Sequence, residues 1–107
     1  MSQDRRRSPR LRTNLKTYWE SGAERHEGVV LNLSVTGCFI VTPANVLAGT
    51  VIRVEVGQPN LLHMTLEGRA VHILKGRGVG VRFKDMTLTQ QALLAKLLKN
   101  IIEQRLK

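Results

Sequence analysis

Short segments in which apolar and polar residues alternate run through most of this sequence, and turn residues separate them. In residues 51–56, Ile52, Val54 and Val56 alternate with charged residues, the pattern of a half-buried antiparallel strand. Other segments of this kind, rich in β-branched or aromatic residues and bounded by turn residues, cover 15–20, 26–31, 62–73, 79–83 and the stretch from the 32–37 turn to residue 41. We therefore expect six β-strands.

The longest of these segments changes its alternation. Met64 and Leu66 share one face, whereas Val71 and Ile73 share the other. The change of face passes through Gly68, so we expect a β-bulge or a bend at that glycine.

From Thr87 onward the apolar residues recur at spacings of three and four, which is typical of an amphipathic helix. Thr87 and Gln90 fit a capping box, so the helix is expected to begin at Leu88 and to run to Leu106. At 107 residues the chain is long enough for one core. Six strands and one helix (about residues 87–106) predict a mainly β fold, a six-stranded antiparallel β-barrel with a C-terminal α-helix over residues 10–107.

Positive charge is concentrated near the N-terminus. The net charge is +9, and five arginines fall within the first twelve residues. They are Arg5, Arg6, Arg7, Arg10 and Arg12. Such a cluster indicates an anionic partner, and the alternative is a solvated tail. Residues 1–9 have no apolar anchor and end in Ser-Pro, so they are expected to form a flexible basic arm, with Arg10 beside the first strand.

Two short motifs stand about twenty residues apart. Arg6 and Arg10 form Arg-x-x-x-Arg, and Asn32, Ser34 and Gly37 form Asn-x-Ser-x-x-Gly. Their order and spacing, together with the later stretches 37–41 and 78–83, resemble the PilZ domain, a bacterial receptor module for the second messenger cyclic di-GMP. The resemblance covers roughly residues 5 to 86. It implies a six-stranded barrel with a C-terminal helix, in agreement with the strand and helix pattern.

The resemblance also implies which residues bind cyclic di-GMP. They are Arg6, Arg10, Asn32, Ser34 and Gly37, with Arg5 and Arg7 as further candidates. The chemistry is suitable, because a guanidinium pairs with phosphate oxygens or with the O6 and N7 of guanine. Asn32 and Ser34 offer an amide and a hydroxyl as hydrogen-bonding groups. Gly37 has no side chain, so the ligand can come close to the backbone there. Without the arginines, the same three residues would indicate an ordinary turn.

Other activities find less support in the sequence. His26, His63 and His72 are dispersed, so a metal site is not expected. No nucleophile, base and orienting group can be assembled, so we do not expect an enzyme, and no cofactor is expected besides the ligand. A small basic barrel that binds RNA or single-stranded DNA is an alternative, but aromatics are few; Trp19 could stack on a base or lie in the core. A PilZ-fold interaction protein that binds no nucleotide is a further alternative.

Location and partners follow from simple features. The longest apolar runs fall far short of the ~20 residues that span a bilayer, so no membrane insertion is expected. No signal peptide is visible, and the single cysteine, Cys38, is interpreted as a small buried hydrophobe. We therefore expect a cytoplasmic protein. With no output domain in the sequence, the signal would pass to an unidentified effector protein or through a homodimer formed by the apolar stripe at residues 93–102 of the helix. The alternative is that the whole stripe closes one side of the barrel and belongs to the core.

Overall fold

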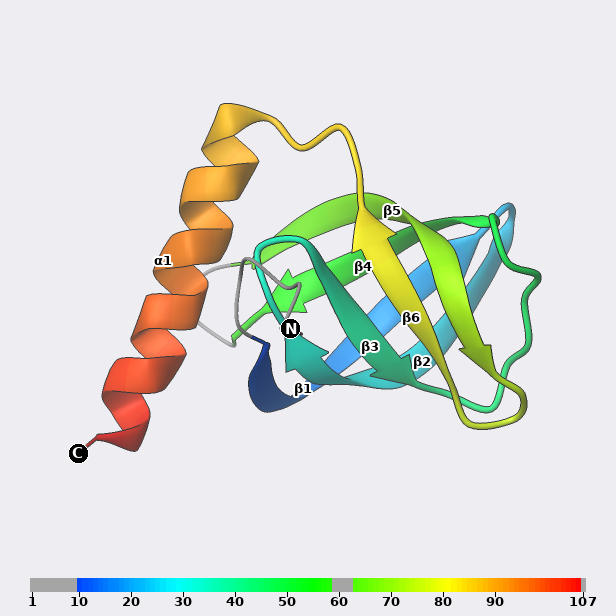
Figure 1. Ribbon diagram of the computed structural model, residues 1–107, viewed down its shortest axis with the longest axis horizontal. Helices are drawn as coiled ribbons and strands as arrows, with labels where there is room; N and C mark the ends of the chain where they lie inside the picture. Colours follow the sequence, from blue (N-terminus) through cyan, green and yellow to red (C-terminus); the bar gives the residue numbers. More distant parts are fainter. Residues whose placement is uncertain (1–9, 59–62, 107) are drawn as a thin grey trace, which may run out of the picture.

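The computed structural model describes residues 10–58 and 63–106, which form a barrel with one helix at its end (Figure 1). The strands are β1 (Leu11–Ser21), β2 (Glu24–Leu33), β3 (Gly37–Val41), β4 (Val51–Gly57), β5 (His63–Leu74) and β6 (Gly78–Phe83), and the helix is α1 (Leu88–Arg105). The strands close in the order β1-β2-β3-β6-β5-β4, and every neighbouring pair is antiparallel. The expected fold class is confirmed. The basic arm predicted for residues 1–9 lies outside the described residues.

Alternation along the strands explains the core. On β4 the side chains of Ile52, Val54 and Val56 point inward and are buried, as their spacing predicts. Trp19 on β1 is also fully buried, so the core interpretation of this residue is correct and base stacking is excluded for it. Aliphatic residues from all six strands fill the rest of the barrel.

The helix α1 lies across the barrel end that holds the start of β1 and the end of β2 (Figure 1). Leu94, Leu97 and Ile101 are buried in the same core as the barrel residues. The capping box is confirmed, because the Thr87 hydroxyl accepts from the Gln90 N–H and the Gln90 side chain accepts from the Thr87 N–H. Leu106 is the C-cap, so the helix proper ends one residue before the expected position.

Two strands are longer than the alternation suggested. β1 begins at Leu11 and β2 continues to Leu33, because the polar ends of these strands pair with each other. In particular, Asn32 pairs with Arg12 and belongs to β2, whereas the sequence pattern had placed it in the following turn. Backbone hydrogen bonds form whether the side chains are polar or apolar. Hydropathy alone therefore predicts a shorter length for these strands.

The irregularity in β5 is real but lies beyond the expected position. The register with β6 shifts between Ala70 and His72, whereas Gly68 pairs regularly with Ile52 on β4 and Phe83 on β6. The exposed Val71 is the extra residue of this bulge. Gly68 is instead required by a close approach, because a Cβ there would overlap the carbonyl oxygen of Arg82.

Candidate ligand-binding site

The turn between β2 and β3 is built around the hydroxyl of Ser34. Its Oγ accepts from the backbone N–H groups of Thr36 and Gly37, both at 3.2 Å, and donates to the Gly37 carbonyl at 3.4 Å. The Ser34 N–H also donates to that carbonyl, at 2.9 Å. Ser34 is fully buried, so its visible role is to fix the shape of the turn.

Gly37 begins β3 where the strand lies against β6. A Cβ at this position would overlap the carbonyl oxygen of Val81, so no larger residue fits without moving a strand. The Thr36 carbonyl accepts from the Phe83 N–H at 2.8 Å, which ties the turn to the end of β6. The glycine of the motif therefore brings β6 close to the turn.

The structure brings the two sequence motifs together. The Nη1 atom of Arg10 donates to the Oδ1 atom of Asn32 at 2.7 Å, across 22 residues of sequence. Arg10 is exposed and precedes β1, and Asn32 is half-buried on β2. The guanidinium has five N–H donors, so this bond leaves others available. The remaining arginine candidates, Arg5, Arg6 and Arg7, lie outside the described residues.

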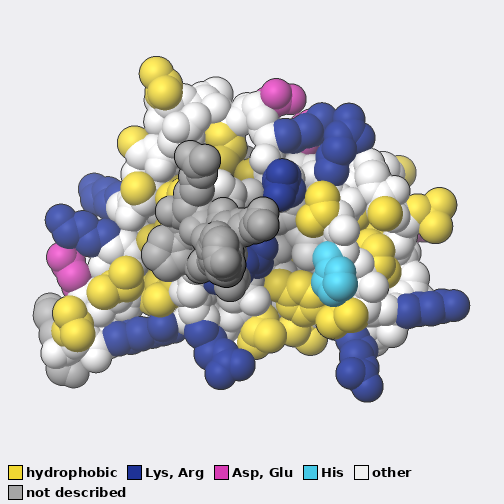
Figure 2. Space-filling model, viewed as in Figure 1, with side chains coloured by type: hydrophobic (Ala, Val, Ile, Leu, Met, Phe, Trp, Pro, Cys, Tyr) yellow, Lys and Arg dark blue, Asp and Glu magenta, His cyan; other side chains and the backbone are white. Residues whose placement is uncertain are grey.

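The same end of the barrel carries arginines whose side chains form no ion pair in the described part of the chain. Arg12 is exposed on β1, and Arg69 and Arg82 are exposed and directly opposite each other on β5 and β6. Within residues 10–58 and 63–106, none of these three side chains nor Arg10 forms an ion pair. Figure 2 shows Lys and Arg side chains gathered over the end of β6 and the adjoining part of β5. This surface is suited to an anion.

An apolar surface continues from Asn32 along the outside of the barrel. The cross-strand neighbour of Asn32 on β3 is Phe39. The Phe39 ring lies against the backbone of Gly78, and a Cβ at Gly78 would be 2.5 Å from the ring. Phe39 also lines a groove of about 910 Å³, together with the outward-facing Tyr18 and Val41. Hydrophobic side chains gather over β3 and β6 in Figure 2. Sequence reasoning missed Phe39, although its place in the β3 alternation, opposite to the buried Ile40, could have revealed it.

The thiol of Cys38 lies beneath this region. Burial raises its pKa to about 12, and the positive charge of Arg10 opposes that shift to a smaller extent. A thiol with such a pKa stays protonated at neutral pH, so the interpretation of Cys38 as a small buried hydrophobe is confirmed.

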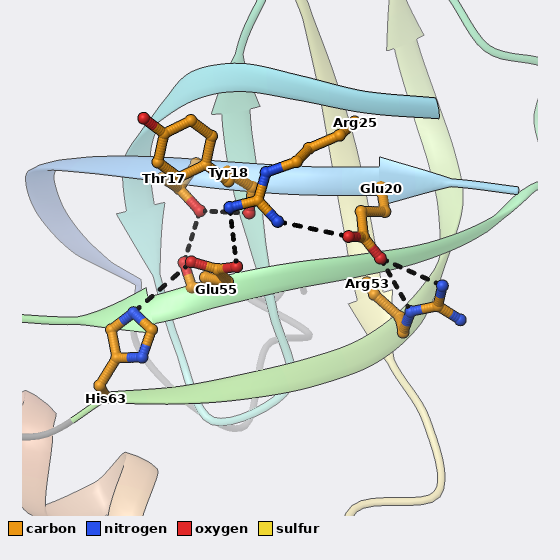
Figure 3. A network of polar contacts seen from close by, with 7 residues as sticks. All are labelled: Thr17, Tyr18, Glu20, Arg25, Arg53, Glu55 and His63. Atoms are coloured by element: carbon orange, nitrogen blue, oxygen red, sulfur yellow. Dashed lines mark hydrogen bonds and ion pairs between the residues drawn. The ribbon is translucent and has the colours of Figure 1, made fainter. Parts of the chain in front are cut away.

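Two carboxylates of the barrel, Glu20 and Glu55, lie elsewhere, at the seam between β1 and β4 (Figure 3). Arg53 pairs with Glu20 at 3.1 Å, and Arg25 lies between Glu20 and Glu55 with 3.4 Å to each. Glu55 also lies 3.6 Å from the Nε2 atom of His63. The charges of this network compensate one another, which makes it unsuitable for an anionic ligand.

Metal and membrane features can be stated briefly. Among the described residues, no group of His, Cys, Asp and Glu side chains could hold a metal ion. The ring of His26 stacks on Trp19 with 4.4 Å between centroids, which gives this histidine a packing role. Helix α1 is the one helix in the described residues, and it is not apolar enough to cross a bilayer.

Comparison with solved structures shows the same fold in several bacterial proteins. The PilZ domain of YcgR from Escherichia coli with c-di-GMP has a TM-score of 0.76 and 17% identity, over 97% of this chain and 99% of that one. The MrkH–c-di-GMP complex from K. pneumonia has a TM-score of 0.77 and 16% identity, over 97% of this chain and 54% of MrkH. The inhibitor of motility MotI/DgrA from Bacillus subtilis has a TM-score of 0.76 and 16% identity, over 94% of this chain and 52% of that one. The chain thus spans about half the length of the last two proteins.

The sequence comparisons are consistent with the fold. A search of curated proteins finds no match. The family model described as PilZ domain matches residues 4–100, which include both motifs, the six strands and most of α1. The chain therefore belongs to the PilZ domain family.

Proposed function

We propose that this protein is a receptor for cyclic di-GMP and has no enzymatic activity. One observation carries the proposal: Arg10 and Asn32, from two motifs far apart in sequence, are joined by a 2.7 Å hydrogen bond beside arginines that have no acidic partner. Two phosphates and two guanines require several positive, planar donors on one surface, and this end of the barrel offers them. The YcgR and MrkH structures, which contain c-di-GMP, support the same ligand.

The proposed contacts divide by the kind of atom that each residue offers. Arg6 and Arg10 bind phosphate oxygens or the guanine edge, and the amide of Asn32 adds a neutral contact that does not repel phosphate. Ser34 and Gly37 remain in the proposed set, and the contribution that their geometry favours is a turn of fixed shape whose backbone the ligand can approach. The flanking Arg5 and Arg7 are proposed as weaker contacts than the motif residues.

Isothermal titration calorimetry tests the proposal directly. The full chain should bind cyclic di-GMP saturably at micromolar concentration or below, whereas GTP and GMP should bind much more weakly. A folded sample that releases no heat with cyclic di-GMP would remove the proposed function. It would leave the alternative of a PilZ-fold interaction protein that binds no nucleotide.

A short single-stranded oligonucleotide is the control for the other alternative, a barrel that binds nucleic acid. Such proteins stack bases on exposed aromatic rings, and Trp19 is buried. Tighter binding of the oligonucleotide than of cyclic di-GMP would favour nucleic acid as the natural ligand.

We propose that the basic arm, residues 1–9, changes its order when the ligand binds. We expect residues 1–9 to be mobile before the ligand arrives and to order across the barrel near Asn32 when Arg6 binds, because ordering is offset by charged contacts. Amide exchange in the free and bound states measures this. An arm that is equally protected in both states would contradict it.

The signal is proposed to leave through an effector protein or a homodimer, with α1 as the contact surface. Leu94, Leu97 and Ile101 are buried in the core, but Ile102 is 46% exposed. We also propose that the protein is cytoplasmic. Light scattering with Ile102→Glu tests the homodimer, since a dimer through this face should shift to monomer while the fold survives. An unchanged mass would exclude that dimer.

A further inference from the structure

The C-terminal end of β6 carries an arginine, Arg82, that neither motif includes. Arg82 lies between the buried Val81 and Phe83, so its side chain points away from the barrel interior. Its register partner on β3 is Gly37, the last residue of the second motif. Because Gly37 has no side chain, the guanidinium of Arg82 has open access to the surface above the turn.

Arg82 and the Arg10–Asn32 contact face the same outer surface from two sides. Asn32 on β2 is the register partner of Phe39 on β3, and Phe39 is the partner of Gly80 on β6, two residues before Arg82. Two strand spacings of about 4.8 Å and two residues of about 3.3 Å put the Cα atoms of Asn32 and Arg82 about 12 Å apart. Side chains of arginine length on both sides can therefore contact a single dinucleotide that lies between them.

The electrostatic environment of Arg82 favours a full negative charge. Arg69 is its direct partner on β5, and like charges opposite each other on neighbouring strands destabilise a sheet. The carbonyl of Gly49 holds the Arg69 guanidinium at 3.0 Å, which keeps this second charge in place. Within the described ranges no carboxylate forms an ion pair with either arginine, because Glu67, two residues before Arg69 on β5, pairs with Lys84 at 3.4 Å. A phosphate relieves this repulsion, whereas the edge of a neutral guanine does so less.

We propose that Arg82 is a ligand-binding residue that contacts one phosphate of the bound dinucleotide, across the site from Arg10. This inference rests on the proposed function, because it assigns a further contact to the same ligand. It adds β6 to a site that the two motifs place on β1, β2 and the turn before β3. Recognition of a phosphate by charge also predicts that lysine can replace this arginine.

Calorimetric titration of cyclic di-GMP into four forms of the full chain tests the inference: unchanged, Arg82→Ala, Arg82→Lys and Arg77→Ala. Arg77 is the matched control, because it is an exposed arginine in the turn before β6, at the far end of that strand from Arg82, and makes no ion pair in the described residues. We expect Arg82→Ala to weaken binding about tenfold, the effect of losing a bond to a charged group. Arg82→Lys should stay within about twofold of the unchanged chain, since it keeps the charge. Arg77→Ala should bind normally.

The outcomes separate this inference from the proposed function. If Arg82→Ala binds as well as the unchanged chain, Arg82 is not a ligand contact, while the receptor function stands. Equal losses in Arg82→Ala and Arg77→Ala would also overturn the assignment, because charge alone would then explain the effect. If Arg82→Lys is as weak as Arg82→Ala, the phosphate assignment is wrong. If the unchanged chain does not bind, the proposed function fails and this inference fails with it. Thermal unfolding of each variant verifies that the barrel is intact.

Discussion

The arginines on the outer surface of the barrel have different partners at the β1/β4 seam and at the end where the motifs lie. At the seam, Glu20 and Glu55 compensate the arginines of β2 and β4, and Arg25 also lies 4.4 Å from the centre of the Tyr18 ring (Figure 3). At the motif end, Arg10 has the neutral Asn32 as its partner, and Arg82 faces another arginine. The arginines of the seam are therefore paired with carboxylates, whereas Arg10 and Arg82 at the motif end form no ion pair among the described residues.

The difference reflects what each region must do. β1 and β4 share only two register pairs, Trp19 with Val54 and Glu20 with Arg53, so side chains must complete the closure of the barrel there. The Thr17 hydroxyl assists by donating to the Glu55 carbonyl at 2.5 Å. β3 and β6, by contrast, pair along the whole of β3, and their closeness depends on glycine. The motif end therefore needs no ion pairs for closure, and its arginines remain available to an anion.

The largest effect is expected from replacing the glycine that brings β3 and β6 together. Gly37→Val should lower the free energy of unfolding by about 3 kcal/mol, because the new side chain overlaps the Val81 backbone. Urea denaturation measures this. Gly22→Ala is the control: its φ of 61° disfavours alanine but nothing lies within 4 Å, so a loss of about 1 kcal/mol is expected. Equal losses at both positions would show that the strand approach at Gly37 is not tight.

Removing the motif arginine should separate binding from stability. Arg10→Ala should weaken cyclic di-GMP binding by ~1.5–3 kcal/mol, tenfold or more, because a bond to a charged group is lost. Arg6→Ala should behave similarly. Arg25→Ala, which removes the same charge at the seam, should bind normally. Comparable losses for Arg10 and Arg25 in calorimetry would mean that charge alone, and not its position, determines affinity.

The converse change should affect stability alone. Arg25→Ala removes contacts to Glu20 and Glu55, and we expect the free energy of unfolding to fall by about 1 kcal/mol, since these side chains are partly exposed and screened by water. Urea denaturation at low and at high salt measures this. The difference between the variant and the unchanged chain should shrink as salt rises. A difference that does not depend on salt would assign the effect to packing of Arg25 on Tyr18.

A smaller effect is expected from the thiol behind the motif end. The pKa of Cys38 rises from 9.0 to about 12 in the folded chain, so this group does not change stability with pH well below 9. Above pH 9 the thiol ionises in the unfolded chain first, and stability should fall by about 0.8 kcal/mol at pH 9.5. Denaturation of the unchanged chain and of Cys38→Ala at pH 7.5 and 9.5 isolates this contribution. If both lose the same stability between the two pH values, the thiol is not shielded as described.

Periodicity and capping were sufficient to predict most of the fold. Alternation identified the six strands, and the capping box located the start of α1, because both patterns are local. The position of the β5 bulge was not predictable in this way, since it depends on the register between β5 and β6, which shifts between Ala70 and His72. Asn32 was assigned to a turn for a similar reason: its strand pairing is with Arg12, twenty residues earlier.

The candidate site was predictable in composition but not in geometry. The motifs identified Arg10 and Asn32, and the structure adds their direct contact, which no spacing rule contains. The burial of Ser34 and the position of Arg82 opposite Gly37 follow from the closure of the barrel. Such relations arise between strands that are distant in sequence, so a single sequence cannot reveal them.

The most direct test of the contrast between the two regions is an NMR titration of the isotope-labelled chain with cyclic di-GMP. The amide signals of Asn32, of residues 34–37 and of Arg82 should shift and saturate together, because these groups surround the proposed ligand. The signals of Arg25, Arg53 and Glu55 at the seam should stay in place. Shifts concentrated at the seam, or spread evenly over all arginines, would contradict the assignment of the motif end as the ligand-binding surface.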